Sequence, residues 1–545
     1  MSVAESADQL DLGSEVVQPK KRPGRPRKNA PNAQKGIVVG VDLGNVTTLV
    51  AFLNALLQKI VAPDPEGLLC TPTVIAFQDG DPDKPLFGRA AKSYCKVHPE
   101  HCFDFMKRAR GHGDVPGIVD KNGRIWSAGE LEALFLQWRL KHVEEMTGLP
   151  IVGVLMCVPA DFNDAQRRAS LDVVLNAGYT PIGTVNEPTA AIVAYGKGKD
   201  GAFVVVDIGG GTTDVSIVRV ENGCEFTVLG TAGRDDRGGR EFTSAIVDSC
   251  VDYARQHGIT LDPEEDARDI ILLDSECENA KIDVTTREST TITFRAKDKL
   301  FDVPLTRATF ESLVAPVCED IFALFTEAMT QTGLQPDQID GLVFAGGGSR
   351  VHCARARIEA FVGLDKVRKD IDVDKAIVMG AVDLIGAKIE ERAAAGNLAI
   401  KAQVEEYQLK ADVNVRDVLG QALGIHAIDK RTGRELMAPI IEQGAPLPAK
   451  ATRLFGLVML QEGLPGTANI VVLQGKALSD AKDCQALQSF VLDKVPDGPM
   501  DERVRVTFAV DTNGLVDVHA IDTLSGSEIA GQVDARGAIA QRQLG

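Results

Sequence analysis

The 545-residue chain lacks any run of about 18 consecutive apolar residues, so we expect no membrane-spanning helix. Its first residues, MSVAESADQLDLGSEVV, contain neither a basic nor an apolar segment, and we therefore expect no signal peptide and a cytoplasmic protein. The ten cysteines form no CxxC pair and lie mostly in apolar segments. This pattern predicts reduced cysteines that pack as small apolar side chains.

Two nucleotide-binding signatures are also missing. The chain has no GxxxxGK[ST], which excludes a P-loop enzyme, and no GxGxxG that opens a helix after a strand, which weighs against a dinucleotide fold. The net charge of -18 argues against a body that binds nucleic acid in general, because an acidic surface repels phosphate. His98, His101 and Cys102 have a metal-like spacing, but no fourth ligand is evident and we favour a structural role.

Changes of composition divide the chain into five segments. The first is polar and basic without apolar periodicity, the second alternates strands and helices, and the fourth contains short alternating strands separated by turn residues. We predict a disordered basic arm, an α/β domain, an interdomain linker, an all-β sandwich domain and a short tail at residues 1–35, 36–411, 412–418, 419–530 and 531–545.

An internal repeat is the most informative feature of the α/β segment. GVDLGNVTTLVAF (40–52) and VVDIGGGTTDVSIV (205–218) share a strand, an aspartate, a glycine, two hydroxyls and a second strand, and FAGGGSR (344–350) adds a third glycine turn. The repeat predicts duplicated subdomains that face each other across a cleft. Glycine-rich backbone binds phosphate, and the aspartates would tolerate phosphate only with a divalent cation between them. The alternative is two hairpins with ordinary tight turns.

Five motifs in this order resemble the heat-shock protein 70 family, the DnaK-type chaperones: GVDLGNVTT, VPADFNDAQRRA, NEPTAAIVAYG, VVDIGGGTTDVSIV and AGGGSR. The later segments VVLQG, FVLDKVP and VRVTFAVDTNGLVDVHAID resemble the peptide-binding β-domain of that family. The resemblance covers about residues 36–530. It implies an α/β fold with a duplicated actin/sugar-kinase-like ATPase domain, followed by an all-β sandwich domain.

The resemblance also implies an ATP/ADP and Mg²⁺ site. Asp42 and Asp207 would hold Mg²⁺ through water, with help from Asp214, while Thr212 would meet the γ-phosphate. Lys107 would orient the attacking water, although the adjacent Arg108 leaves this assignment open by one position, and Glu187 would lie near the metal. The remaining nucleotide contacts would be Gly44, Asn45, Val46, Gly209, Gly210, Gly211, Thr213, Gly238, Gly239, Glu278, Lys281, Gly346, Gly347, Gly348, Arg350 and Asp374.

Several positions depart from the family pattern. Asn45 replaces a threonine, Gly348 replaces a serine, and Ile282 replaces an arginine that stacks on adenine, so we expect ATP to bind with weaker affinity than is usual in the family. The linker VNVRD has only Val413 and Val415 as apolar contacts, and Arg416 interrupts them. Looser coupling between the domains is therefore expected.

The resemblance further implies binding of unfolded or extended polypeptide clients, and possible J-domain co-chaperone and nucleotide exchange factor partners in protein folding and stress response. Pro159 and Arg167 match the family's relay between the two domains. Ile425, Ile428, Phe455 and Ile470 are candidates for the peptide groove and equally for plain sandwich core. The tail is too short for the family's helical lid, which predicts fast peptide release.

Two other functional classes stay open. The basic arm at 20–28, KKRPGRPRK, resembles an AT-hook, which predicts contact with the minor groove of A·T-rich DNA or with another polyanion. A nucleotide-sensing regulator of the same fold, tethered through this arm and with weak turnover, is one alternative. A sugar or metabolite kinase is the other, and the β segment together with NEPTAAIVAYG argues against it.

Overall fold

The computed structural model describes residues 36–112, 115–263, 265–369, 372–394, 413–457, 467–498 and 501–533. The basic arm and the tail that follows residue 533 lie outside the described residues. The described part contains an α/β region and a β-sandwich, as expected from the alternation of strand and helix patterns.

The first sheet of the α/β region contains the first predicted hairpin. Its strands have the order β11-β10-β1-β2-β3, with β4 paired to β2. β1 and β2 are antiparallel, whereas β10 joins β1 in parallel and β11 joins β10 in parallel. The bounds are β1 Ile37–Leu43, β2 Thr47–Leu53, β3 Lys59–Val61, β4 Thr71–Pro72, β10 Ile151–Val158 and β11 Pro181–Asn186.

The second sheet repeats this arrangement around the second hairpin. β12 and β13 are antiparallel, and β17 joins β12 in parallel, so that the order is β17-β12-β13-β14-β18. The repeat read in the sequence is thus a repeat of strand topology. The bounds are β12 Gly201–Ile208, β13 Thr213–Glu221, β14 Glu225–Arg234, β17 Gly341–Ala345 and β18 Asn414–Arg416.

Helices cover these sheets, and their ends follow local chemistry. Asn163 caps α3 in a capping box with Gln166. α2 begins at a similar box, Ser127 with Glu130, and ends at the left-handed Gly148. The helix bounds are α1 Gly88–Cys95, α2 Ala128–Thr147, α3 Asp164–Asn176, α4 Glu187–Gly196, α5 Gly239–Gln256, α6 Ala267–Thr286, α7 Arg307–Thr332, α8 His352–Val362 and α9 Ala376–Ala394.

Smaller elements decorate the α/β region. They are the sheet β6-β5-β7 and the hairpins β8-β9 and β15-β16. Their bounds are β5 Ile75–Phe77, β6 Pro85–Phe87, β7 Cys102–Phe103, β8 Pro116–Val119, β9 Ile125–Ser127, β15 Ser289–Ala296 and β16 Lys299–Thr306.

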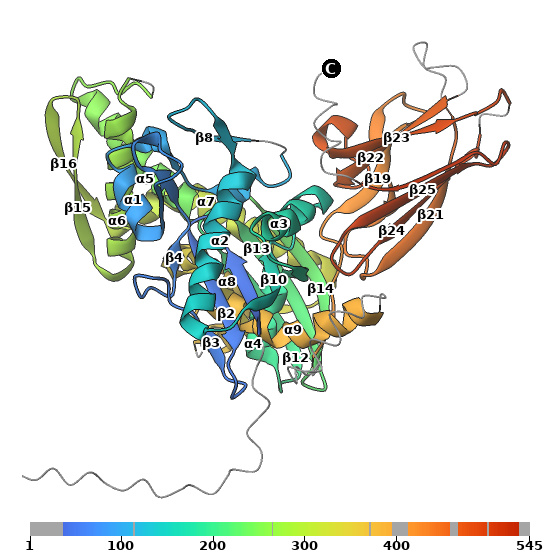
Figure 1. Ribbon diagram of the computed structural model, residues 1–545, viewed down its shortest axis with the longest axis horizontal. Coiled ribbons are helices and arrows are strands. Elements are labelled where there is room, and N and C mark those ends of the chain that lie inside the picture. Colours follow the sequence, from blue (N-terminus) through green and yellow to red (C-terminus); the bar gives the residue numbers. More distant parts are fainter. Residues whose placement is uncertain are drawn as a thin grey trace, which may run out of the picture. The chain divides into compact units, whose positions relative to one another are not determined.

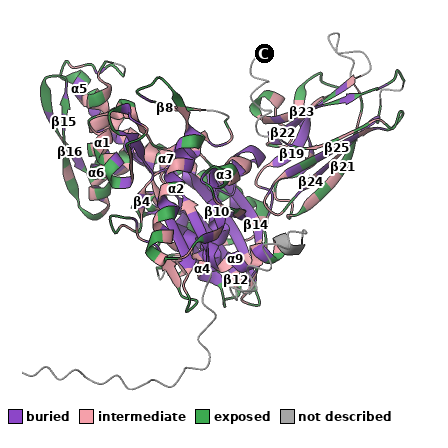
Figure 2. Cartoon of the chain, viewed as in Figure 1, coloured by how far each residue is buried: buried purple, intermediate pink, exposed green. Residues whose placement is uncertain are grey.

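The two sheets share one hydrophobic core with α4 and α9. Buried residues of β1, β2, β10 and β11 meet those of β12, β13 and β17 around these helices, and Figure 2 shows the strands of this region as mostly buried. A Cβ added to Gly380 of α9 would lie 1.7 Å from the Ala190 carbonyl oxygen of α4. The close approach of α4 and α9 therefore requires glycine at this position.

The C-terminal part is a two-layer β-sandwich, as predicted (Figure 1). The layers have the orders β20-β19-β22-β23 and β21-β24-β25-β26. Alternate side chains such as Val472, Leu487, Val506 and Phe508 fill the space between the layers. The bounds are β19 Ala422–Ile428, β20 Glu435–Ile441, β21 Ala449–Phe455, β22 Thr467–Gly475, β23 Gln485–Asp493, β24 Val504–Val510, β25 Val516–Asp522 and β26 Glu528–Gln532.

The prediction that all cysteines are reduced is wrong for one pair. Cys95 and Cys102 form a disulfide, because the end of α1 and the start of β7 bring their Cα atoms to 5.7 Å, within the range that a disulfide spans. The other eight cysteines are free, and Cys157, Cys250 and Cys277 are buried as expected. Within the described ranges no helix is both long and apolar enough to cross a membrane.

The contact between α4 and α9 gives a stability prediction. We expect Gly380→Ala to lower the free energy of unfolding by about 1–3 kcal/mol or more, since the new methyl group overlaps the Ala190 carbonyl. Gly129→Ala is the matched control, because Gly129 is also helical but has no atom within 4 Å of the added Cβ. Denaturant unfolding checks both variants, and equal midpoints for the two would contradict the predicted overlap.

Candidate active site

Two adjoining cavities, of about 60 Å³ and about 640 Å³, form one cleft in the α/β region. Both are lined by the turn between β1 and β2, the turn between β12 and β13, and the glycine turn that follows β17. Asn45, Val46, Gly210, Gly347 and Asp374 belong to the walls of both cavities. The three glycine-bearing segments singled out in the sequence thus meet at one place.

The small cavity is lined by charged residues that are separated in the sequence. Asp42 and Asp207 come from the ends of β1 and β12, Glu187 begins α4, and Lys107 lies in the 3₁₀ helix Met106–Ala109. The Lys107 ammonium lies 2.5 Å from Glu187 Oε1, and the two side chains are only 4% and 3% exposed. The site therefore contains a buried ion pair beside two further carboxyl groups.

Burial and mutual repulsion change the protonation of these groups. Burial, with the charge of Glu187 added, raises the pKa of Asp42 to about 7, and the same two causes raise the pKa of Asp207 well above its ordinary value. Although burial opposes the charge of Lys107, Glu187 and Asp42 raise its pKa. One ammonium group is thus surrounded by three carboxyl groups.

These residues fit a hydrated divalent cation. Asp207 Oδ1 is buried and accepts no hydrogen bond from any described residue. Hard cations such as Mg²⁺ prefer carboxylate and water oxygens, and a cation near Asp42 and Asp207 would remove their repulsion. Asp214 is placed differently, because its Oδ1 accepts the N–H of Ala160 and it lines neither cavity.

The structure separates the roles of Lys107 and Arg108. Lys107 points into the small cavity, whereas Arg108 donates from Nη2 to the Gly211 carbonyl and forms an ion pair of 2.8 Å with Glu241. Of the two, only Lys107 lines the small cavity.

Backbone geometry holds the glycine turns against the carboxylates. Gly346 has a φ of +74°, and a Cβ at this position would lie 2.4 Å from Asp207 Oδ1. Only glycine satisfies both conditions. The turn after β12 is fastened to the start of α5, because the N–H groups of Gly239 and Arg240 donate to the carbonyls of Gly209 and Gly210.

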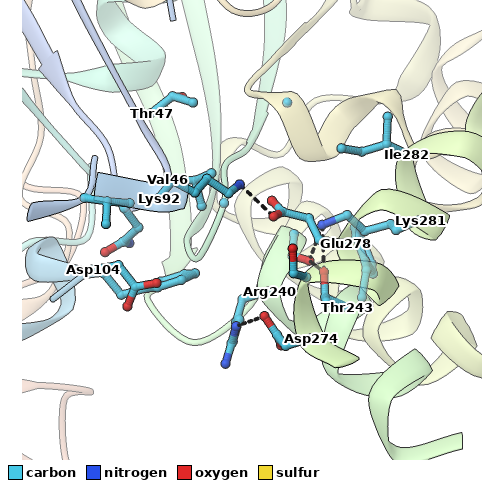
Figure 3. Close-up of a pocket in the computed structure, with 18 of the residues that line it drawn as sticks. Val46, Thr47, Lys92, Asp104, Arg240, Thr243, Asp274, Glu278, Lys281 and Ile282 are labelled. Carbon is cyan, nitrogen blue, oxygen red and sulfur yellow. Dashed lines mark hydrogen bonds and ion pairs between the residues drawn. The ribbon is translucent and has the colours of Figure 1, made fainter. Parts of the chain in front are cut away.

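Charged side chains line the large cavity, and several come from helices α1 and α6, which lie outside the glycine motifs (Figure 3). Lys92 of α1 lies 2.8 Å from Glu278 of α6 and holds the pKa of that carboxyl below its ordinary value despite burial. Lys281 donates to the Gly239 carbonyl and to Thr243, while burial lowers its pKa. Arg350 pairs with Asp374 at 2.6 Å.

Most of the predicted nucleotide contacts line this cleft, and a few do not. Thr213 is turned away and donates to the Arg237 carbonyl. The carbonyl of Gly211 accepts a hydrogen bond from Arg108, and Gly238 packs against the backbone of Gly209 and Gly211. The predicted residues along the cleft are Asp42, Gly44, Asn45, Val46, Lys107, Glu187, Asp207, Gly209, Gly210, Thr212, Gly239, Glu278, Lys281, Gly346, Gly347, Gly348, Arg350 and Asp374.

Other cleft residues were not anticipated from the sequence. Arg240 of α5 pairs with Asp274 of α6 at 2.9 Å and lies over the ring of Phe105 at 5.2 Å. Lys92 and Arg240 follow no motif, and a charged residue on a helix is usually solvent-exposed. Arg240 directly follows the predicted contacts Gly238 and Gly239, and Phe105 lies two residues before Lys107, whereas Lys92 has no such neighbour in the sequence.

The unusual residues at Asn45 and Ile282 have clear environments. Asn45 is 4% exposed, and its Oδ1 accepts the backbone N–H of Arg108. Ile282 lines the large cavity and is 58% exposed, so an apolar ring could cover it. Where an arginine could form a cation–π contact with such a ring, Ile282 can offer only apolar packing.

The proposed relay lies between the cleft and the sandwich. Arg167 is buried and donates to the carbonyls of Phe162 and Ala160 and to Asn186 Oδ1. Asn186 in turn donates to Asp417 Oδ2 at 2.6 Å. Pro159 follows the last residue of β10, directly precedes Ala160 and is buried.

The linker and the groove candidates also have defined places. β18 pairs in parallel with β14, Val413 is buried, and Arg416 is exposed, so this arginine does not interrupt the apolar contacts. Ile425 and Ile470 lie in the sandwich core at 6% and 3% exposure, while Ile428 and Phe455 are half-buried.

A duplicated hairpin-plus-parallel-strand topology, with an aspartate from each hairpin in one glycine-lined cleft, defines the actin-like class of ATPases. A sequence profile described as Hsp70 protein matches residues 38–543 of this chain. The chain therefore belongs to the Hsp70 family, whose members are chaperone-type ATPases with an actin-like ATPase domain and a β-sandwich.

The pKa of Asp42 gives a prediction for cation binding. In the folded chain without metal, the pKa of Asp42 is about 7, above its ordinary value. The free energy of unfolding is therefore higher at low pH, where Asp42 is protonated, and falls as the pH rises through about 7 and the carboxyl group ionises. We expect Mg²⁺ to raise the thermal midpoint more at about pH 8 than at about pH 5.5, where the carboxyl groups are protonated.

Differential scanning fluorimetry with and without Mg²⁺ at the two pH values measures this difference. Asp207→Asn should reduce the response to Mg²⁺ at the higher pH, whereas Asp365→Asn, outside the cleft, should leave it unchanged. An equal Mg²⁺ shift at both pH values would contradict the assignment of these carboxylates.

Proposed function

We propose that this protein is an ATP-dependent chaperone that hydrolyses ATP and binds extended, apolar segments of unfolded polypeptides. The observation that carries this proposal is the buried group of Asp42, Asp207, Glu187 and Lys107 at the end of a glycine-lined cleft, in a chain that continues through a paired strand into a β-sandwich. The cleft suits a nucleotide, and the sandwich suits a main-chain ligand.

In this proposal, the residues of the small cavity position the phosphate and the water. Asp42 and Asp207 would hold hydrated Mg²⁺, which would supply positive charge to the phosphate oxygens. Lys107, kept protonated by Glu187 and Asp42, orients the attacking water and stabilises the charge that develops on the transferred phosphoryl group. Thr212 and the backbone of Gly210 face the phosphates from the second hairpin, while the Gly209 N–H donates to the Thr212 carbonyl and fixes the turn.

The large cavity accommodates the nucleoside. Glu278 and Lys281 of α6 provide polar contacts, and Gly347, Gly348 and Arg350 bound the opposite wall. Ile282 offers only an apolar surface, so we propose weaker adenine binding than an arginine at this position would give.

Coupling to the sandwich passes through the linker. Asp417 accepts a hydrogen bond from Asn186, the residue before Glu187, while Asp164 of α3 accepts the N–H of Val516 in β25. We propose that Pro159 and Arg167 transmit the state of the cleft through these contacts. In the sandwich, we propose Ile428 and Phe455 as peptide contacts, with Ile425 and Ile470 behind them in the core.

Other partners would follow from this activity. A J-domain co-chaperone would stimulate hydrolysis and an exchange factor would open the cleft. The predicted DNA contact through residues 20–28 lies outside the described residues.

A nucleotide-sensing regulator is the second candidate, and Asn45 favours it. The amide of Asn45 is buried and bound to the Arg108 backbone, so this position offers no hydroxyl to the phosphates. ATP binding without measurable hydrolysis, with or without peptide, would favour this candidate over the chaperone.

Single-turnover hydrolysis of ATP tests the role of Lys107. We expect Lys107→Ala to reduce the rate constant by about 100-fold or more, because the variant removes a preorganised charge from the reacting phosphate. Nucleotide binding, measured by titration calorimetry, should persist. Lys121→Ala is the control, since Lys121 is an exposed lysine paired with Asp81 away from the cleft. Hydrolysis at the wild-type rate in Lys107→Ala would reject the assignment.

The linker strand makes a separate prediction about coupling. We expect Val413→Asp to abolish the change in ATP turnover that an unfolded client causes, because a carboxylate at this buried position disfavours the seating of β18 beside β14. Basal turnover should change less than the client response. Arg416→Ala, in the strand β18 that directly follows Val413, changes an exposed residue and should retain the response. Loss of the response in both variants would argue against a specific role of Val413.

A further inference from the structure

The disulfide between Cys95 and Cys102 lies in the wall of the large cavity. Both cysteines line this cavity together with Lys96 and Pro99 from the short segment that the bond closes. Both are half-buried, so a small oxidant or reductant can reach them through the cleft, whereas Cys157, Cys250 and Cys277 are buried.

The bond joins two segments that carry cleft residues. On α1, Lys92 lies three residues before Cys95, hence on the same side of the helix, and it reaches across the cavity to Glu278 of α6. On the other side, Cys102 begins β7, which leads through Phe103 and Phe105 into the 3₁₀ helix that carries Lys107. Phe103 and Phe105 both line the large cavity.

The disulfide therefore fixes the C-terminal end of α1 relative to β7 and to the residues that lead from β7 to Lys107. Two other interactions of the described residues join elements around this cavity, the partly exposed ion pair of Lys92 and Glu278 (Figure 3) and the contact of Arg240 with the ring of Phe105. Without the disulfide, the last turn of α1 gains freedom, and the ion pair it carries loses its fixed geometry.

We propose that Cys95 and Cys102 are a reversible oxidation site that controls how fast nucleotide leaves the cleft. This inference rests on the proposed function, because it assumes that the cleft holds a nucleotide. The oxidised form holds α1 and Lys92 over the cavity and releases nucleotide slowly. The reduced form releases it faster.

The oxidant is a peroxide. The thiolate of one cysteine attacks a peroxide oxygen, breaks the O–O bond and becomes a sulfenic acid, while the other oxygen leaves as water after taking a proton. The second thiol then displaces the hydroxyl from this sulfur, which forms the S–S bond and a second water. The two electrons lost by the cysteines are gained by the peroxide. A dithiol reverses the step by exchange, leaves as its cyclic disulfide and returns both protons to the cysteines.

The chain offers an internal control for oxidation elsewhere. Cys318 of α7 and Cys353 of α8 have sulfur atoms 3.7 Å apart but line neither cavity of the cleft. A peroxide that oxidises this second pair should leave nucleotide release unchanged.

The experiment uses the full chain, treated with hydrogen peroxide or with dithiothreitol. Alkylation of free thiols followed by peptide mass mapping shows whether Cys95 and Cys102 are joined. Stopped-flow chase of a fluorescent ADP analogue then gives the release rate. We expect release from the oxidised chain to be about three- to fivefold slower, the scale of one partly exposed ion pair. Cys95→Ser and Cys102→Ser should release at the fast rate after either treatment, while Cys353→Ser should keep the difference.

Three results would overturn the inference. The first is failure of the two cysteines to join in peroxide. The second is equal release rates for the joined and the reduced chain, which would leave the proposed ATPase function intact. The third is failure of the analogue to bind in either state, which would reject the proposed function together with the gating role.

Discussion

The charge balance at the end of the cleft constrains the rest of this structure. Lys107 and Glu187 neutralise each other in a buried pair, and Asp42 and Asp207 are left with raised pKa values beside them. Burying carboxyl groups without partners destabilises a fold, so the surrounding elements must hold them in place. They do so with backbone: two strand ends, the start of α4 and a glycine turn at Gly346 that leaves no room for a side chain. Such a site gains stability when a cation arrives.

The duplicated topology explains why two distant aspartates can meet. Each hairpin is joined in parallel by a later strand, β10 in one sheet and β17 in the other, so each aspartate lies at the equivalent strand end. The sheets are held together by α4 and α9, whose axes approach closely because residue 380 is glycine. Packing at this helix pair and charge at the cleft are thus linked through α4, which begins with Glu187.

Local chemistry made much of this fold predictable. The hairpins, the Asn163 cap and the alternating strands of the sandwich follow from short sequence patterns, and the glycine motifs indicated the small cavity of the cleft. The large cavity was less predictable, since Lys92 and Arg240 lie on helices where exposed charges are common and only tertiary packing turns them into the cavity. The disulfide was missed for the same reason: Cys102 lies seven positions after Cys95, and the turn that brings them together depends on where α1 and β7 pack. Ile425 and Ile470 could not be assigned, because alternation shows which face of a strand is apolar and not whether a ligand covers it.

The junction of β11 and α4 connects the two ends of the proposed cycle most directly. Asn186 donates to the linker carboxylate Asp417, and the next residue, Glu187, holds Lys107. Asn186 and Glu187 are joined by a rigid peptide unit. A backbone shift of Glu187 toward or away from Lys107 therefore also moves Asn186, whose side-chain amide donates to Asp417. Arg167 stabilises the same junction through Asn186 Oδ1, and its own charge is balanced by Asp417 and Asp161. In the proposed cycle, a change in phosphate charge at Lys107 would have this short covalent and hydrogen-bonded route to the strand that precedes the sandwich.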